Sequence, residues 1–201
     1  RKVVDTWTIE VGITGIVSLV EHEEIADHSD FIKDILVINN ELLHYNYFVS
    51  CSMDKKVHLY DLATLRHKAT RTGLTAGVQC LAYDNRSLLM AGGFDYNIIA
   101  WDLDAEIDRP IFQLWGHSSP ICKIVSIGSI DRTLSLDTSG VLRLWDSSKA
   151  NPNDKEARQI DTLSFVDDTF RNFDVFTNVS SNFGTAHSII ITAQGCKQHL
   201  Y

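Results

Sequence analysis

Long apolar runs are missing from this chain of 201 residues. Its longest candidates, Ile35–Ile38 and Ser188–Ile191, have the length of strands, whereas a membrane-spanning helix needs roughly 18 apolar residues. We therefore expect no membrane partner. The chain begins with Arg1-Lys2, without an initiator Met and without a signal peptide. These features predict a cytoplasmic segment from within a larger protein.

Cysteine and basic charge are also scarce. The four cysteines are Cys51, Cys80, Cys122 and Cys196, and no pair has the C-x2-4-C spacing that zinc or a redox dithiol requires. Each lies in an apolar, strand-like run, which predicts reduced, buried thiols. The net charge of −8 repels phosphate backbones, so we expect no nucleic-acid partner. The basic stretch 66–71 is interpreted as a solvated loop.

Motifs of catalysis and cofactor binding do not occur in the chain. There is no G-x-S-x-G, P-loop, G-x-G-x-x-G or HExxH, and Gly92-Gly93 is a pair at a strand end without a following helix. Four acidic residues alternate like the start of an EF-hand loop: Asp102, Asp104, Glu106 and Asp108. The sixth and twelfth positions of such a loop are Gly and Glu, but here they are Ile107 and Gln113. We expect a solvated loop there, and no catalytic residue, cofactor or metal ion in the chain.

What the chain does contain is a repeat. An aromatic-Asp pair ends three β-rich runs, with steps of 41 and 44 residues: Tyr60-Asp61, Trp101-Asp102 and Trp145-Asp146. Each run predicts a β-hairpin, because two stretches rich in β-branched and aromatic residues flank a polar turn. A further strand precedes each hairpin, at Phe31–Ile38, Val78–Tyr83 and Ile121–Ile127. The loops before the first and third of these strands contain His28 and Gly116-His117.

These residues resemble the WD40 family, whose propeller blades recur about every 40–45 residues. The resemblance implies an all-β propeller of about four to five blades, as a partial ring or part of a larger protein. We interpret 1–201 as one propeller region, with these parts: 1–21 as the end of a preceding blade, 28–66, 74–115 and 117–165 as blades, and 170–201 as a partial blade. A loop insertion at 147–158 accounts for the length of the last repeat.

The resemblance also implies a buried network in each blade, formed by a loop His, a turn Asp, a strand Ser or Thr and the strand Trp. The first blade has His28 and Asp54, with Ser50 or Ser52 nearby, but Tyr60 replaces Trp.

The second blade has Asp95 and Trp101, but its entry loop has Thr75 in place of His. The third has His117 and Trp145; the position six residues before the Trp is Ser139, and Asp137 lies two residues earlier. We therefore expect no blade to have the full set. We also expect His28 and His117 to be structural, since no second His or Cys lies at ligand spacing.

Propeller loops on a rigid scaffold are suited to recognition of other proteins or peptides. We expect partners to contact Asp27–Asp30, Thr72–Gly77 and His117–Pro120 on one face. The amino-acid sequence of residues 28–146 resembles that of the large WD-repeat proteins of cilia and flagella, which often carry EF-hands elsewhere in the chain. That resemblance implies a non-catalytic axonemal or cytoskeletal scaffold in microtubule-associated complexes. The alternative is an enzyme or ligand-binding propeller that uses its central channel.

Overall fold

The structure is a computed structural model that describes residues 2–11, 17–41, 44–105, 108–149, 159–164, 170–178 and 186–193. These residues form β-strands, joined by turns and by a 3₁₀ turn at Gly128–Ile130. None of the helical structure in these ranges has the length and apolar character needed to cross a membrane.

Three antiparallel sheets of four strands follow one another along the chain, each with its strands in sequence order. The first blade consists of β3 (Ile32–Asn40), β4 (Tyr45–Ser52), β5 (Val57–Asp61) and β6 (His67–Arg71). The second consists of β7 (Val78–Tyr83), β8 (Leu88–Gly93), β9 (Ile98–Asp102) and β10 (Phe112–Leu114). The third consists of β11 (Ile121–Ile127), β12 (Arg132–Asp137), β13 (Val141–Asp146) and β14 (Gln159–Ser164).

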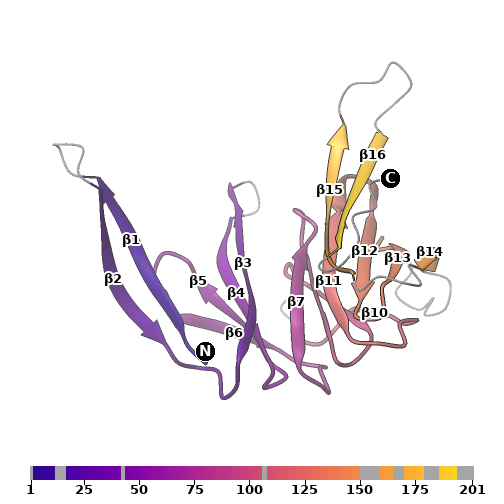
Figure 1. Ribbon diagram of the computed structural model, residues 1–201. Coiled ribbons are helices and arrows are strands. Elements are labelled where there is room, and N and C mark those ends of the chain that lie inside the picture. The colour runs from indigo at the N-terminus through magenta and orange to yellow at the C-terminus, as the bar shows by residue number, and fades with distance from the viewer. Residues whose placement is uncertain are drawn as a thin grey trace.

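Two hairpins flank these blades. β1 (Val4–Val11) pairs with β2 (Val17–Ile25) before the first blade, and β15 (Phe170–Asn178) pairs with β16 (Ala186–Ala193) after the third. Figure 1 shows the five sheets arranged as an open arc, with the hairpins at its two ends. The predicted all-β fold, a partial propeller, is therefore confirmed. Of the partial blade expected at 170–201, residues 179–185 and 194–201 lie outside the described residues.

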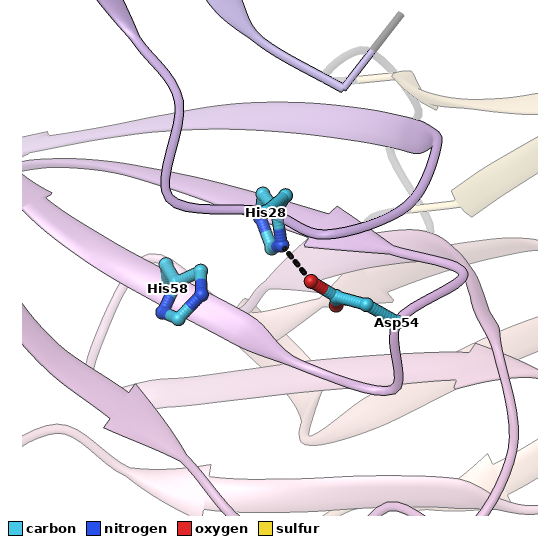
Figure 2. Close-up of side chains that lie close together, drawn as sticks. All are labelled: His28, Asp54 and His58. Carbon is cyan, nitrogen blue, oxygen red and sulfur yellow. Dashed lines mark hydrogen bonds and ion pairs between the residues drawn. The ribbon is translucent and has the colours of Figure 1, made fainter.

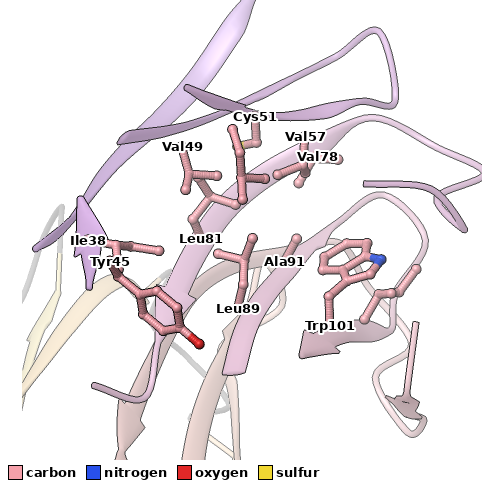
Figure 3. Close-up of a cluster of buried hydrophobic side chains, with 12 residues drawn as sticks. Ile38, Tyr45, Val49, Cys51, Val57, Val78, Leu81, Leu89, Ala91 and Trp101 are labelled. Carbon is pink, nitrogen blue, oxygen red and sulfur yellow. The ribbon is translucent and has the colours of Figure 1, made fainter. Parts of the chain in front are cut away.

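The blades pack through their innermost strands. β7 contacts both β3 and β11, and the first residue of each of these strands is followed by a register shift typical of a β-bulge. Between the first and second blades lies an apolar cluster that includes Val49, Leu89 and Trp101 (Figure 3). Trp145 packs in the same way against the second blade, beside Met90. Each tryptophan thus joins its own blade to the preceding one.

One sequence interpretation changes in the structure. The expected solvated loop at 66–71 is wrong, because His67–Arg71 forms β6, the outer strand of the first blade. The side chain of Arg71 is buried and donates to Asp108 at 2.6 Å. Two of the alternating carboxylates lie at the loop expected after β9, where Lys149 pairs with Asp102 and Tyr45 donates to Asp104. Residues 106–107 lie outside the described residues.

Candidate functional site

The entry loop of each blade lies beside the turn between its second and third strands. Backbone hydrogen bonds of 2.9 Å join the two segments in every blade: Met53 N to Phe31 O, Phe94 N to Gly77 O, and Thr138 N to Pro120 O. We call this end of the blades the loop face. The loops expected to meet partners, 27–30, 72–77 and 117–120, all belong to it, together with the three turns.

The third blade has a complete buried network beneath its entry loop. His117 Nδ1 lies 2.7 Å from Asp137 Oδ2, and its Nε2 lies 2.6 Å from Ser135 Oγ. Trp145 Nε1 donates to the same Ser135 oxygen at 2.7 Å. The expectation that no blade has the full set is therefore wrong for this blade. Such a network satisfies polar groups that would be costly to bury alone.

Asp137 was missed because it does not sit six residues before the tryptophan, as Asp54 and Asp95 sit before their aromatic residues. It is the last residue of β12, and a short turn with Gly140 at φ 83° connects it to β13. Its Oδ1 accepts hydrogen bonds from the backbone N–H groups of Ser139 and Val141, each at 3.0 Å. The carboxylate therefore arrives at His117 from a different backbone position.

Burial and hydrogen bonding have opposite effects on the pKa values of His117 and Asp137 in this network. Burial lowers the pKa of His117 below its usual value, although its contact with Asp137 opposes that shift. Burial raises the pKa of Asp137, but hydrogen bonds from Ser139, Val141 and His117 outweigh it, so the net shift is downward. The pair is therefore a neutral imidazole that donates from Nδ1 to a carboxylate, and its Nε2 accepts from Ser135.

The first blade has a similar network with a different aromatic residue. His28 Nδ1 lies 2.9 Å from Asp54 Oδ2 and its Nε2 lies 2.8 Å from Ser50 Oγ, so Ser50 is the serine in contact with His28. Ser52 donates instead to the backbone oxygen of Asp30 at 3.0 Å. Tyr60, which stands where the third blade has Trp145, is buried and stacks on Phe48 with ring centroids 4.6 Å apart.

A second imidazole lies beside this network and was not expected from the sequence. The ring centroids of His28 and His58 are 4.4 Å apart, and Figure 2 shows both side chains next to Asp54. His58 Nδ1 lies 2.8 Å from Thr70 Oγ1 and 3.2 Å from His67 Nε2. Burial and the neighbouring imidazoles lower the pKa of His58 to about 4, so this ring is neutral at neutral pH.

The second blade replaces the histidine network with shorter side chains. The Thr75 backbone N–H donates to Asp95 Oδ2 at 2.9 Å, and the Thr75 hydroxyl donates to the other carboxylate oxygen. Ala91 occupies the strand position of Ser50 and Ser135. Trp101 Nε1 therefore donates to the backbone oxygen of Thr72, at 2.9 Å.

The aspartates that follow the aromatic residues lie at the opposite end of the third strand, where each one closes a turn. Asp61 Oδ1 accepts from the backbone of Thr64 at 2.7 Å, and Asp146 Oδ1 accepts from the backbone of Ser148 at 2.9 Å. Asp102 Oδ1 accepts from the Asp104 backbone at 3.1 Å. Gly116 lies against Trp145, where a Cβ atom would be 3.1 Å from the indole.

A groove opens on the loop face between the second blade and the segment that leads to the third. It has a volume of about 480 Å³, and its lining includes Thr75, Asp95, Asn97, Pro110 and Trp115. The indole of Trp115 is 52% exposed. Three more exposed aromatic side chains belong to loop-face segments: Phe31, Phe94 and Tyr96. This end of the blades therefore combines aromatic surface with a carboxylate, two features that occur in sites of protein recognition.

Repeated four-stranded sheets, inner strands in contact and buried His-Asp-Ser networks in the first and third blades define a β-propeller of WD40 type. A family profile described as "WD domain, G-beta repeat" matches residues 24–61, which contain His28, Asp54 and Tyr60. The fold and this match make the chain similar to WD40-repeat proteins.

Three proteins illustrate this similarity. The chain is 25% identical over 130 residues to cilia- and flagella-associated protein 337 B of Tetrahymena thermophila, covering 64% of this chain and 10% of that protein. It is 39% identical over 77 residues to DDB1- and CUL4-associated factor 10 of Xenopus laevis, covering 37% and 16%. It is 29% identical over 91 residues to the WD repeat-containing protein on Y chromosome of Anopheles gambiae, covering 45% and 8%. The chain thus spans less than a fifth of each relative.

Proposed function

We propose that this chain is a non-catalytic interaction scaffold that binds a protein or peptide on its loop face. The observation that carries the proposal is the loop-face groove, whose lining includes Trp115 together with Asp95 and Asn97 of the polar turn. Tryptophan is enriched among the few residues that carry most of the binding energy in protein interfaces. The entry loops are held by the buried networks beneath them, so the face is preorganised for binding.

The cluster of titratable groups that an enzyme would need is not placed for turnover. Within the described side chains, His28, Asp54 and His58 form such a cluster, and it lies buried beneath an entry loop. His28 already forms a hydrogen bond with Ser50, and His58 forms one with Thr70. The Asp54 carboxylate accepts a hydrogen bond from the Ser29 backbone. The burial and hydrogen bonding of these three residues support a scaffold function over the alternative of an enzymatic propeller.

Affinity purification of the full-length protein, followed by mass spectrometry, tests the scaffold. The comparison is between wild type, Trp115→Ser and a control, Ile130→Ser. Ile130 is 42% exposed and lies in the 3₁₀ turn between β11 and β12, away from the loop face. We expect Trp115→Ser to lose a partner that the control retains. If both variants recover every partner equally, the proposal that partners bind the loop face is contradicted.

For the biological setting, we propose a ciliary or axonemal scaffold. The supporting observation is the relative from Tetrahymena thermophila, whose match covers 64% of this chain. A tagged full-length protein should be confined to the cilium or flagellum and should co-purify with microtubule-associated complexes. A purely nuclear location would contradict this setting.

A second setting rests on a different relative. The match to DDB1- and CUL4-associated factor 10 is shorter, but it reaches 39% identity. If this chain shares that association, immunoprecipitation should recover DDB1 and CUL4 with the full-length protein. Recovery of both from cells without cilia would favour this setting over the ciliary one.

A further inference from the structure

Three side chains from separate segments of the first blade offer metal-ligating atoms close together. His28 comes from the entry loop, Asp54 from the turn after β4, and His58 from β5 (Figure 2). One ligand atom from each lies within 4.8 Å of the other two. The side chains of His28 and Asp54 are only 1% and 2% exposed, and His58 is buried with them. Spacing along the sequence does not indicate this group, because folding brings distant segments together.

One nitrogen in this cluster has no hydrogen-bond partner. His58 Nε2 is buried without a donor or acceptor, whereas its Nδ1 contacts Thr70. A buried, unpaired imidazole nitrogen is costly, since folding removes it from water without compensation. The neutral ring presents a lone pair at that atom, which is the form that binds a metal ion.

We propose that the first blade binds a zinc-class transition-metal ion through His28 Nδ1, Asp54 Oδ2 and His58 Nε2. The 2.9 Å separation of the His28 and Asp54 atoms is close to the distance of roughly 3.3 Å between two ligands of a tetrahedral zinc ion with bonds near 2.0 Å. The ion takes the place of the proton between them. A small movement of His58 completes three protein ligands, and water occupies the fourth position.

The second nitrogen or oxygen of each ligand already has a partner of the kind found around metal sites. His28 Nε2 faces Ser50 Oγ, so the proton displaced from Nδ1 moves to Nε2 and is donated to that hydroxyl. His58 Nδ1 donates to Thr70 in the same way. Asp54 Oδ1 accepts from the Lys56 backbone at 3.0 Å. Such outer partners fix the orientation and tautomer of metal-bound histidines.

The other blades show that this set is peculiar to the first one. Strand pairing places His58 opposite Ser50, in the position of Ile99 in the second blade and Arg143 in the third. His67 corresponds in the same way to Gln159, because these residues pair with Tyr60 and Trp145. A propeller blade therefore does not need an imidazole at position 58, and the structural His-Asp-Ser network of the third blade exists without one.

Two imidazole nitrogens and one carboxylate oxygen favour Zn²⁺ among common ions, while Mg²⁺ and Ca²⁺ prefer oxygen ligands alone. The ion would join the entry loop to the β4–β5 turn and to β5. Its expected effect is to stabilise the first blade, because it binds the folded state and not the separated segments.

The test is a titration of the metal-free chain with Zn²⁺ in competition with a chromophoric chelator, repeated with Co²⁺ to record the visible absorption of a tetrahedral site. The decisive variant is His58→Ile, which carries the side chain of the second blade at this position and preserves the His28–Asp54–Ser50 network. We expect one tightly bound ion in the wild type, and affinity lower by at least about 100-fold in His58→Ile. Zinc should raise the Tm of the wild type but not that of His58→Ile.

Two further variants separate the site from general imidazole binding. His44→Asn removes an exposed histidine at φ 55°, a conformation that Asn tolerates, and it should bind zinc as the wild type does. His67→Gln copies the third blade and should retain the site with affinity reduced by about tenfold at most. Equal zinc affinity in the wild type and His58→Ile, or no tetrahedral Co²⁺ spectrum in the folded wild type, would overturn the proposal.

Discussion

At the scale of single residues, the side chain on the second strand decides how the buried aromatic residue of each blade is satisfied. In the third blade, Ser135 receives a hydrogen bond from Trp145 and donates to His117. In the second blade, Ala91 cannot do this, and Trp101 bonds to a loop carbonyl instead. A serine hydroxyl is thus the centre of the complete network, since it acts as donor and acceptor at once.

We predict that Ser135→Ala destabilises the chain by about 2–3 kcal/mol, because it leaves two buried groups, His117 Nε2 and Trp145 Nε1, without partners. Urea unfolding followed by tryptophan fluorescence measures this loss. The matched control is Ser126→Ala on β11, whose hydroxyl is buried without a partner. The control should change the free energy of unfolding by less than about 0.5 kcal/mol. Similar losses in both variants would argue against the network as the cause.

A second prediction concerns pH and His58. Because the folded-state pKa is about 4 and the usual value is near 6.5, the unfolded chain binds the proton more readily than the folded one. The stability linked to this residue is therefore complete above about pH 6.5 and is lost as the pH falls towards 4. We expect the wild type to lose about 2 kcal/mol more than His58→Ile between pH 7 and pH 4.5.

Chemical unfolding of both proteins across this pH range, with a chelator present, makes the measurement. Protonation of Asp54 and the other carboxylates affects both proteins, so the difference isolates the imidazole. Parallel stability curves for the two proteins would show that His58 is not held neutral by the fold.

The residue scale also shows what a sequence pattern can and cannot specify. Thr75 and the aromatic positions follow from the register of the repeat, whereas the sequence left Ser50 and Ser52 as alternatives that the His28 contact decides. Asp137 does not, because a fixed offset from the tryptophan assumes turns of equal length, and the third turn is built differently. His58 was missed for another reason: its proximity to His28 depends on how the entry loop folds over β4 and β5.

At the scale of strands, runs of β-branched and aromatic residues on either side of polar turns predicted the inner three strands of each blade closely. The expected strands Val78–Tyr83 and Ile121–Ile127 have the same bounds in the structure. The outer strands were harder to predict, since the residues of β6 and β14 are mostly polar. β6 is largely exposed, β14 has no buried residue, and β10 has three residues in all. Their pairing with the preceding strand, and not hydrophobic periodicity, makes them part of the sheet.

Close backbone packing at the end of β8 gives an element-scale prediction. A Cβ atom on Gly93 would lie 2.3 Å from the backbone oxygen of Gly77 and 2.9 Å from the backbone of Gln79. A Cβ atom on Gly92 would instead meet the side chain of Ile124 in the next blade, at 2.9 Å. Backbone cannot move without disturbing the β7–β8 pairing, whereas a side chain can adopt another rotamer.

We therefore predict that Gly93→Ala destabilises the chain by about 3 kcal/mol and Gly92→Ala by about 1 kcal/mol. Thermal unfolding monitored by circular dichroism can rank the two variants. Both substitutions make the same chemical change at adjacent buried positions, so each serves as the control of the other. The reverse order would mean that contact between blades, and not pairing within the blade, limits this strand.

At the scale of the whole molecule, the arc presents an uncovered apolar surface beside the first blade. β7 packs against neighbours on both sides and most of its residues are buried, but the residues of β3 alternate between partly buried and exposed. Ile35 and Val37 lie on the exposed side, and Val37 is 58% exposed. Together with Trp7 they line a groove of about 510 Å³ between the β1–β2 hairpin and the first blade.

In a closed propeller, every inner strand lies between two neighbours, and rings contain about four to eight blades. The three four-stranded sheets described in this chain form part of such a ring, so β3 has one apolar side that a closed ring would cover. Contiguous exposed apolar surface of this kind promotes association between molecules. We predict that the 201-residue chain, prepared alone, self-associates in a concentration-dependent manner.

Sedimentation velocity over a range of protein concentrations measures this association. The double variant Ile35→Thr and Val37→Thr keeps β-branched side chains, which suit a strand, while it reduces apolar surface at the groove. It should shift the chain towards the monomer, whereas Ile130→Thr, an exposed apolar position in the 3₁₀ turn, should associate as the wild type does. A wild-type chain that remains monomeric at high concentration would mean that the exposed side of β3 is tolerated in water, and that closure of the ring contributes little to solubility.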